Sequence, residues 1–230
     1  TTARRYFRYG IPVELFQERL KHTARPDLIM VTSVMTYWYP GVCETIGILK
    51  ARLPGTPVIL GGIYPALCPE HAAKYSGADH VVSACTSEET GVLNTLIPDL
   101  DSCFRRNDTV PPAYDLLEHN SAAALQTSYG CPFSCTYCAS KLIAPKFIQR
   151  NHDAIMAELV NDRKLGIRNI AFYDDALLFK AETHFIPLIE RVIAEKFNFF
   201  FHTPNGLHAR FITPRVAALM KAAGFRTIRL

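Results

Sequence analysis

Three cysteines in the string TSYGCPFSCTYCAS have the spacing of a metal centre. Cys131, Cys135 and Cys138 follow one another as C-x3-C-x2-C, so their thiolates can reach one metal ion or one iron–sulfur cluster. A structural zinc site takes four ligands, and no fourth cysteine or histidine lies nearby in the sequence. The motif therefore predicts a centre with one open coordination position, with a zinc site or three unrelated thiols as the alternatives.

Apolar segments of strand length alternate with helical segments in the first part of the chain. These strands are continuous apolar runs, which is typical of parallel strands buried on both faces. Right-handed crossovers between them then give a doubly wound, Rossmann-like α/β layer. The expected strands are residues 27–33, 57–60 and 80–83, and the expected helices are residues 12–20, 41–52 and 69–75.

The alternation resumes after a polar stretch with three prolines, and the cysteine motif directly follows the first strand there. In a βα barrel, the loops after the strands carry the active site. Four strands do not close such a barrel, so we expect a partial barrel in a truncated chain, cut from a longer polypeptide. The expected strands are residues 122–127, 169–173, 198–202 and 225–230, and the expected helices are residues 153–165, 181–196 and 213–223. The expected domains are residues 1–100 and 121–230, joined by a linker at 101–120.

The composition of the chain indicates its cellular compartment and the classes of partner to expect. The chain has 230 residues, a net charge of +4 and no long block of like charge, so a nucleic-acid partner is not expected. Seven cysteines, an odd number, do not make a disulfide framework and favour a reducing cytoplasm. No apolar run is long enough to span a bilayer and no signal peptide is present, so no membrane partner is expected.

The string CPFSCTYC resembles the C-x3-C-x-aromatic-C motif of the radical S-adenosylmethionine (SAM) superfamily. In that superfamily the motif lies in the loop after the first strand of a partial βα barrel, as expected here. The resemblance implies that Cys131, Cys135 and Cys138 bind three irons of a [4Fe–4S] cluster, and that SAM binds the fourth. A reductant such as flavodoxin or ferredoxin then supplies the electron with which the cluster cleaves SAM to a 5′-deoxyadenosyl radical.

Four further residues are candidates for SAM contacts. Tyr137 precedes the third cysteine, where an aromatic ring can shield the cluster. Asp174 and Asp175 end the second expected barrel strand, where the superfamily often binds the amino group of SAM; the alternative is a pair of helix-capping residues. His202 ends the third strand and Asn205 follows it, so the two could line a pocket; the alternative is a plain turn at Pro204–Asn205–Gly206. No catalytic residue is assigned.

The first α/β domain resembles the cobalamin-binding domain of cobalamin-dependent radical SAM enzymes. Ser33-Val34-Met35 is close to the S-x-L turn of that family, and Gly61-Gly62 is similar to its glycine pair, with 25 residues between Met35 and Gly61. Glycines at such strand ends let the backbone approach a large ligand. The D-x-H-x-x-G motif that supplies a cobalt ligand in some cobalamin proteins is absent from the chain, and we expect it to lie upstream of Thr1 if the protein has one. Cobalamin without that histidine, or a domain that has lost cobalamin, are both open.

These resemblances imply methyl transfer or another radical rearrangement on a small-molecule substrate. A second hypothesis is a methylthiotransferase that modifies RNA, because Cys43, Cys68 and Cys85 all follow expected strands and could bind a second cluster. A third hypothesis is a binding fragment without catalysis, since half of the barrel is missing.

Overall fold

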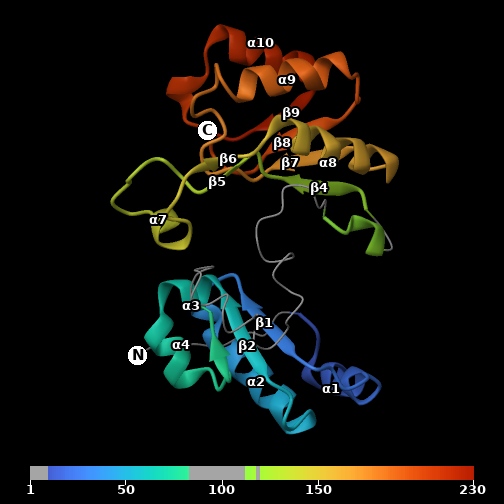
Figure 1. Ribbon diagram of the computed structural model, residues 1–230, viewed down its shortest axis with the longest axis vertical. Coiled ribbons are helices and arrows are strands. Elements are labelled where there is room, and N and C mark those ends of the chain that lie inside the picture. The colour runs from blue at the N-terminus through green and yellow to red at the C-terminus, as the bar shows by residue number, and fades with distance from the viewer. Residues whose placement is uncertain (1–9, 83–111, 118–119) are drawn as a thin grey trace, which may run out of the picture. The chain divides into compact units, whose positions relative to one another are not determined.

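The computed structural model describes residues 10–82, 112–117 and 120–230, which belong to two compact units, residues 1–100 and 101–230 (Figure 1). Most of the predicted linker at 101–120 lies outside the described residues. Each unit is an α/β layer with a parallel sheet, as the strand patterns predicted. Among the described residues, no helix has the length and apolar content needed to cross a membrane.

The first unit contains a parallel sheet in the order β1 (Ile29–Ser33), β2 (Val58–Gly62), β3 (His80–Val81). Strand β2 lies in the middle, and its apolar residues Val58, Ile59 and Leu60 are buried, as expected for a parallel strand covered on both faces. The register aligns Ser33 with Gly62, so the two cobalamin-type motifs end neighbouring strands. The helices are α1 (Val13–Lys21), α2 (Tyr39–Arg52), α3 (Ile63–Leu67) and α4 (Pro69–Tyr75).

The second unit is a partial barrel whose four-stranded parallel sheet has the order β4 (Ala122–Leu125), β7 (Asn169–Phe172), β8 (Phe200–Thr203), β9 (Phe225–Ile228). Helices α8 (His152–Lys164), α9 (Phe185–Ala194) and α10 (Pro214–Ala223) connect these strands. The predicted order of strands and helices is confirmed, with α9 starting four residues later than expected.

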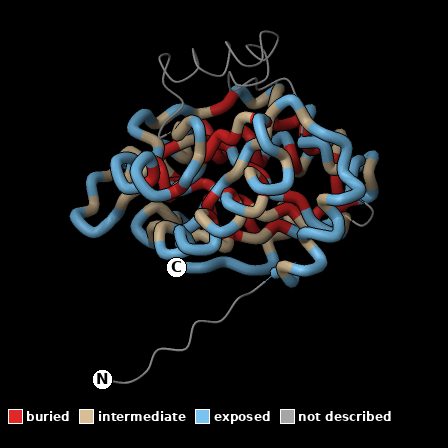
Figure 2. The backbone as a smooth tube through the Cα atoms, turned by 90° about the horizontal axis from the view of Figure 1, so that it is seen from below, coloured by how far each residue is buried: buried red, intermediate tan, exposed pale blue. Residues whose placement is uncertain are grey.

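Local signals explain where the elements of the second unit begin and end. The Thr213 side chain accepts a hydrogen bond from the Val216 N–H and so caps α10, while Gly224 ends that helix in the left-handed conformation at φ +99°. Figure 2 shows the buried stretches of the backbone in red. Side chains in the second unit form an aromatic core. Its rings belong to neighbouring strands: Phe172, Phe201 and Phe225, with centroids 5.3–5.4 Å apart. Burial of Phe172 and Phe201 contributes about 1.5–3 kcal/mol each, and the partly buried Phe225 contributes less.

Strand β4 is at the edge of the sheet, and Tyr114 satisfies part of that edge. Tyr114 belongs to the short 3-10 helix η3 (Tyr114–Leu116), in the described part of the predicted linker. Its hydroxyl accepts the Ala124 N–H at 2.8 Å and donates to the Ala124 carbonyl at 3.3 Å. The Tyr114 side chain thus binds the backbone groups of Ala124 that a neighbouring strand would otherwise pair with. The segment that contains η3 therefore packs against β4.

Candidate cofactor sites

The cysteine motif lies in a loop that is closed at its base by a short antiparallel pair. Strands β5 (Ser128–Tyr129) and β6 (Ile148–Gln149) pair with each other at the carboxyl end of β4 and enclose the short helix α7 (Ser140–Ile143). Gly130 starts the loop at φ +71°, and a Cβ there would stand 2.4 Å from the Lys146 carbonyl oxygen. Only glycine therefore lets the outgoing and returning chains pass so closely.

The three thiols of the loop are free, and two of them act on Cys131. Cys131 and Cys135 are half-buried and Cys138 is exposed. Desolvation raises the pKa of Cys131, and the negative charges of Asp175, Cys138 and Cys135 raise it further. Hydrogen bonds with Ser140 lower the pKa of Cys138.

The donor set of the loop is three free thiols, the ligand type of iron–sulfur clusters. In the described part of the chain, no three His, Cys, Asp or Glu side chains form a group that could hold one metal ion. A cubane cluster binds each cysteine through a different iron, so its thiolates stand farther apart than the ligands of one ion. Three thiols in one loop, close enough to shift the Cys131 pKa, are compatible with that wider arrangement.

An aromatic group anchors the middle of the loop. The Phe133 ring lies between Cys131 and Cys135 in sequence and contacts the rings of Phe179 at 5.6 Å and His208 at 4.6 Å. The Arg210 guanidinium lies 4.9 Å from the Phe133 ring centroid. These partners follow β7 and β8, so the loop is attached to the carboxyl ends of the same sheet. The sequence pattern did not single out Phe133.

The structure separates the two carboxylates that end β7. The Asp174 side chain is 3% exposed and accepts hydrogen bonds from the hydroxyls of Thr127 at 2.8 Å and Ser128 at 2.7 Å. Burial raises its pKa, against the effect of these donors. Asp175 is exposed, and its charge acts on Cys131. Neither caps a helix, because α9 begins ten residues later. Asp174 is thus occupied by protein donors, whereas Asp175 is the exposed carboxylate of the pair.

The remaining predicted SAM contacts differ in exposure. Tyr137 is 90% exposed at the outside of the cysteine loop. The Asn205 side-chain amide donates to the Tyr173 carbonyl at 3.0 Å and so ties the end of β8 to the end of β7. His202 is bound across the sheet, with Nδ1 2.7 Å from the Thr227 hydroxyl and Nε2 3.2 Å from Asn169 Oδ1.

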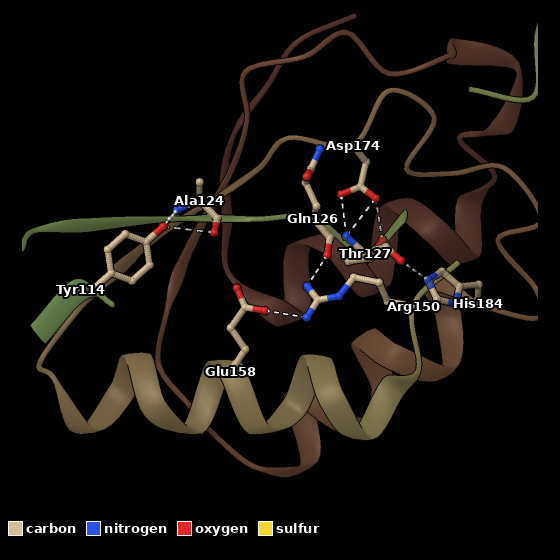
Figure 3. A network of polar contacts seen from close by, with 8 residues as sticks. All are labelled: Tyr114, Ala124, Gln126, Thr127, Arg150, Glu158, Asp174 and His184. Atoms are coloured by element: carbon tan, nitrogen blue, oxygen red, sulfur yellow. Dashed lines mark hydrogen bonds and ion pairs between the residues drawn. The ribbon is translucent and has the colours of Figure 1, made fainter. Parts of the chain in front are cut away.

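A buried polar network surrounds the start of the cysteine loop, and it was not predicted from the sequence (Figure 3). The Arg150–Glu158 ion pair, 2.8 Å long, has both side chains buried. Arg150 Nη1 also donates to the Gln126 carbonyl at 2.6 Å. Burial lowers the pKa of His184, which lies 3.1 Å from the Thr127 carbonyl. In the sequence, only charged residues at apolar positions of the helix expected at 153–165 indicate such a network.

In the first unit, the serine and glycine motifs meet at the carboxyl ends of β1 and β2. Ser33 is buried, and its hydroxyl donates to the Met35 carbonyl at 2.9 Å, which forms a tight turn. Gly62, at φ +93°, packs against Ser33, whereas a Cβ on Gly61 would have no atom within 4 Å. Gly62 therefore shapes the turn, and Gly61 leaves open space beside it.

Exposed apolar side chains follow this turn. Between 40 and 68% of each side chain is accessible in a run that includes Val34, Met35, Tyr37, Trp38 and Tyr39. Exposed aromatic residues in such a run mark a binding surface rather than a solvated loop. Together with the space at Gly61, this surface suits a large, flat, partly apolar ligand, as cobalamin is.

Two of the three cysteines proposed for a second cluster are described. Cys43 lies in α2 and Cys68 follows α3, and both are half-buried. Both lie near Tyr64, and burial and the charges of the two cysteines raise the pKa of Tyr64. Cys85 lies outside the described residues. Whether the three thiols converge therefore stays a prediction.

Comparisons with known proteins agree with these motifs. Residues 8–90 match the B12 binding domain family. A structure of the radical SAM methyltransferase TsrM from Kitasatospora setae, with tryptophan substrate and the SAM analogue aza-SAM bound, matches with a TM-score of 0.69 and 16% identity over 94% of this chain and 50% of that chain. A TsrM structure with cobalamin and a [4Fe–4S] cluster bound matches with a TM-score of 0.71 and 16% identity over 93% of this chain and 51% of that chain.

This chain thus spans about half the length of the TsrM structures it matches. No curated protein matches it by sequence. At 16% identity the likeness to TsrM is a likeness of fold. Residues 8–90 match the B12 binding domain family and the chain shares the fold of the TsrM structures, which supports the resemblance to cobalamin-binding radical SAM proteins.

Proposed function

We propose that this chain is the cofactor-binding part of a radical SAM enzyme that uses cobalamin in methyl transfer, or in another radical rearrangement, of a small-molecule substrate. The observation that carries the proposal is the position of the cysteine loop. It begins at the carboxyl end of the first strand of a parallel sheet, in a chain whose residues 8–90 match a B12-binding domain. Flavodoxin or ferredoxin is the proposed class of electron donor.

Cys131, Cys135 and Cys138 would hold three irons of a [4Fe–4S] cluster and leave the fourth for SAM. When bound and reduced, the cluster would supply the electron that cleaves the C–S bond of SAM, and cobalamin would supply a methyl group. Asp175, exposed and close to Cys131, would bind the amino group of SAM by charge. Phe133 and its aromatic neighbours would hold the loop against the sheet and exclude water from one side of it.

The first unit would hold cobalamin at the carboxyl ends of β1 and β2. The Ser33 turn and Gly62 fix the shape of the backbone there, and Gly61 leaves room for the ligand. The exposed rings of Tyr37 and Trp38 would cover part of its apolar surface.

Anaerobic reconstitution with iron and sulfide tests the cluster. We expect about four irons per chain with broad visible absorbance, and loss of both in Cys135→Ala. Cys68→Ala, on the other unit, is the matched control and should keep its iron. Stoichiometric zinc without iron after anaerobic purification would contradict the proposal. About eight irons, falling to about four in Cys68→Ala, would favour the methylthiotransferase hypothesis instead.

Incubation with hydroxocobalamin followed by desalting tests the first unit. We expect about one cobalt retained per chain, with a shifted visible spectrum, because a preformed surface needs little reordering to bind. Complete loss of cobalt on desalting, in protein that is folded by circular dichroism, would mean that this domain does not bind cobalamin.

A further inference from the structure

Side chains from distant parts of the second unit bind both the backbone N–H and the backbone carbonyl of Thr127 (Figure 3). The Thr127 N–H donates to both carboxylate oxygens of Asp174, at 3.0 and 3.1 Å. The Thr127 carbonyl accepts the backbone N–H of Arg150 at 2.9 Å and lies 3.1 Å from Nε2 of His184. Thr127 is fully buried, so no water competes for these groups.

These anchors are themselves fixed. The Arg150 guanidinium is paired with Glu158 of helix α8 in a buried ion pair. The other ring nitrogen of His184 lies 3.1 Å from Nε2 of His152, the first residue of the same helix. Asp174 follows strand β7, and Asn205 donates a hydrogen bond to its carbonyl at 3.4 Å. The start of the cysteine loop is therefore connected to α8, β7 and the end of β8.

We propose that Asp174 is a positioning residue for the cysteine loop and not a ligand-binding carboxylate. Its oxygens fix Thr127 and Ser128, and the first cysteine follows only three residues after Ser128. A carboxylate can accept all four of these hydrogen bonds at once, and no neutral side chain of its size offers the same acceptors. A change at Asp174 would alter the direction in which the chain enters the loop.

The position of the loop can be tested without iron. In the reduced, iron-free protein, Asp174→Asn places an amide NH2 against hydrogen-bond donors, so the loop should open more often. We expect alkylation of Cys131 by a maleimide to be about tenfold faster. A rise of this size corresponds to the loss of one charge-assisted hydrogen bond that holds the loop closed. Peptide mass spectrometry gives the rate at each thiol, and Cys43 and Cys68 on the first unit should react as in the wild type.

Two further variants separate positioning from general loss of stability. Thr127→Ser keeps the hydroxyl that donates to Asp174 and should behave as the wild type. Val192→Ala removes buried apolar volume in α9, away from Thr127, and should lower the melting temperature without a matching rise in Cys131 alkylation. Wild-type alkylation in Asp174→Asn, or an equal rise in Val192→Ala at equal stability, would overturn the proposal.

The reconstituted protein provides a second, spectroscopic test, which rests on the proposed function. If Asp174 positions the loop, Asp174→Asn should bind iron in the wild-type amount, whereas the electron paramagnetic resonance spectrum of its reduced cluster should change in g values. An unchanged spectrum at equal iron content would count against positioning. If the wild type itself binds no iron, the proposed function fails, and the alkylation rates still decide the role of Asp174.

Discussion

Gly62 packs so closely against Ser33 that a methyl group on its Cα would stand 2.6 Å from the Ser33 carbonyl oxygen. The two residues are partners in the register of β1 and β2. Gly62 also has φ +93° and ψ −163°, a conformation that essentially only glycine adopts. Gly61, one residue earlier, has open space around its Cα. The two glycines of one motif thus serve different purposes, since one shapes the turn and the other leaves room beside it.

Alanine at these two positions should therefore have different effects. Gly62→Ala should destabilise the first unit by at least about 1–3 kcal/mol from backbone strain alone, and reduce retention of hydroxocobalamin. Gly61→Ala should leave the unfolding transition unchanged and weaken cobalamin binding only, because its methyl group enters the space left for the ligand. Thermal unfolding and cobalt retention measure the two effects. Equal stability losses in both variants would show that the contact between Gly62 and Ser33 is not tight in solution.

The sequence predicted what depends on local pattern. Continuous apolar runs identified the strands, and Thr213 and Gly224 marked the ends of α10 correctly, because a cap depends on neighbours a few residues away. The short pair β5–β6 was missed, since strands of two residues have no periodicity to detect.

Tertiary contacts decided the rest of the candidate site. Asp174 and Asp175 are adjacent and chemically alike, but Asp174 is buried and bound to Thr127, 47 residues away in sequence, whereas Asp175 is exposed. In the sequence, Phe133 does not differ from other loop residues. Its role depends on Phe179 and His208, which contact its ring only in the folded chain. No pattern within a single segment carries such information.

Asp175→Asn should weaken the binding of SAM. The exposed carboxylate would lose its charge and with it the attraction to the ammonium group of SAM, which we expect to raise the Kd about tenfold. Isothermal titration of the anaerobically reconstituted protein with SAM measures the change. Asp175→Glu, which keeps the charge, is the matched control and should retain most of the affinity. A Kd in Asp175→Asn equal to that of the wild type would exclude Asp175 as the ammonium partner.

Phe133→Ala should loosen the cysteine loop. The ring is half-buried among Phe179, His208 and Arg210, so its loss should cost about 1–2 kcal/mol, less than for a fully buried phenylalanine. We expect the reconstituted cluster to lose iron faster to a chelator. Phe133→Leu keeps much of the apolar volume and should lie between the wild type and the alanine variant. Iron loss that is equally slow in all three proteins would mean that this aromatic contact does not protect the cluster.

Asp162 should make the stability of the second unit depend on pH. Its side chain is fully buried in α8, and neither carboxylate oxygen has a hydrogen-bond partner among the described residues. Burial, aided by the negative charge of Glu158, raises the pKa of Asp162 from 3.8 to about 6. The folded protein therefore holds this proton more tightly than the unfolded chain does. Stability due to Asp162 is greatest at low pH and declines as the pH rises from about 4 to above 6.

Asp162→Asn removes this titration, so its stability relative to the wild type should increase with pH. At about 1.4 kcal/mol for each pKa unit, the gain at pH 8 should be about 2–3 kcal/mol and should be small near pH 4. Urea unfolding at several pH values measures it. Burial also lowers the pKa of His184, so the contribution of His184 to the stability of the protein decreases as the pH falls. This contribution is the same in both proteins and cancels in the difference. Asp153→Asn on the same helix, where the carboxylate is exposed and paired with Arg191, should show no such gain at high pH. A difference between Asp162→Asn and the wild type that stays constant from pH 4 to pH 8 would mean that Asp162 titrates normally and that its carboxylate is solvated in solution.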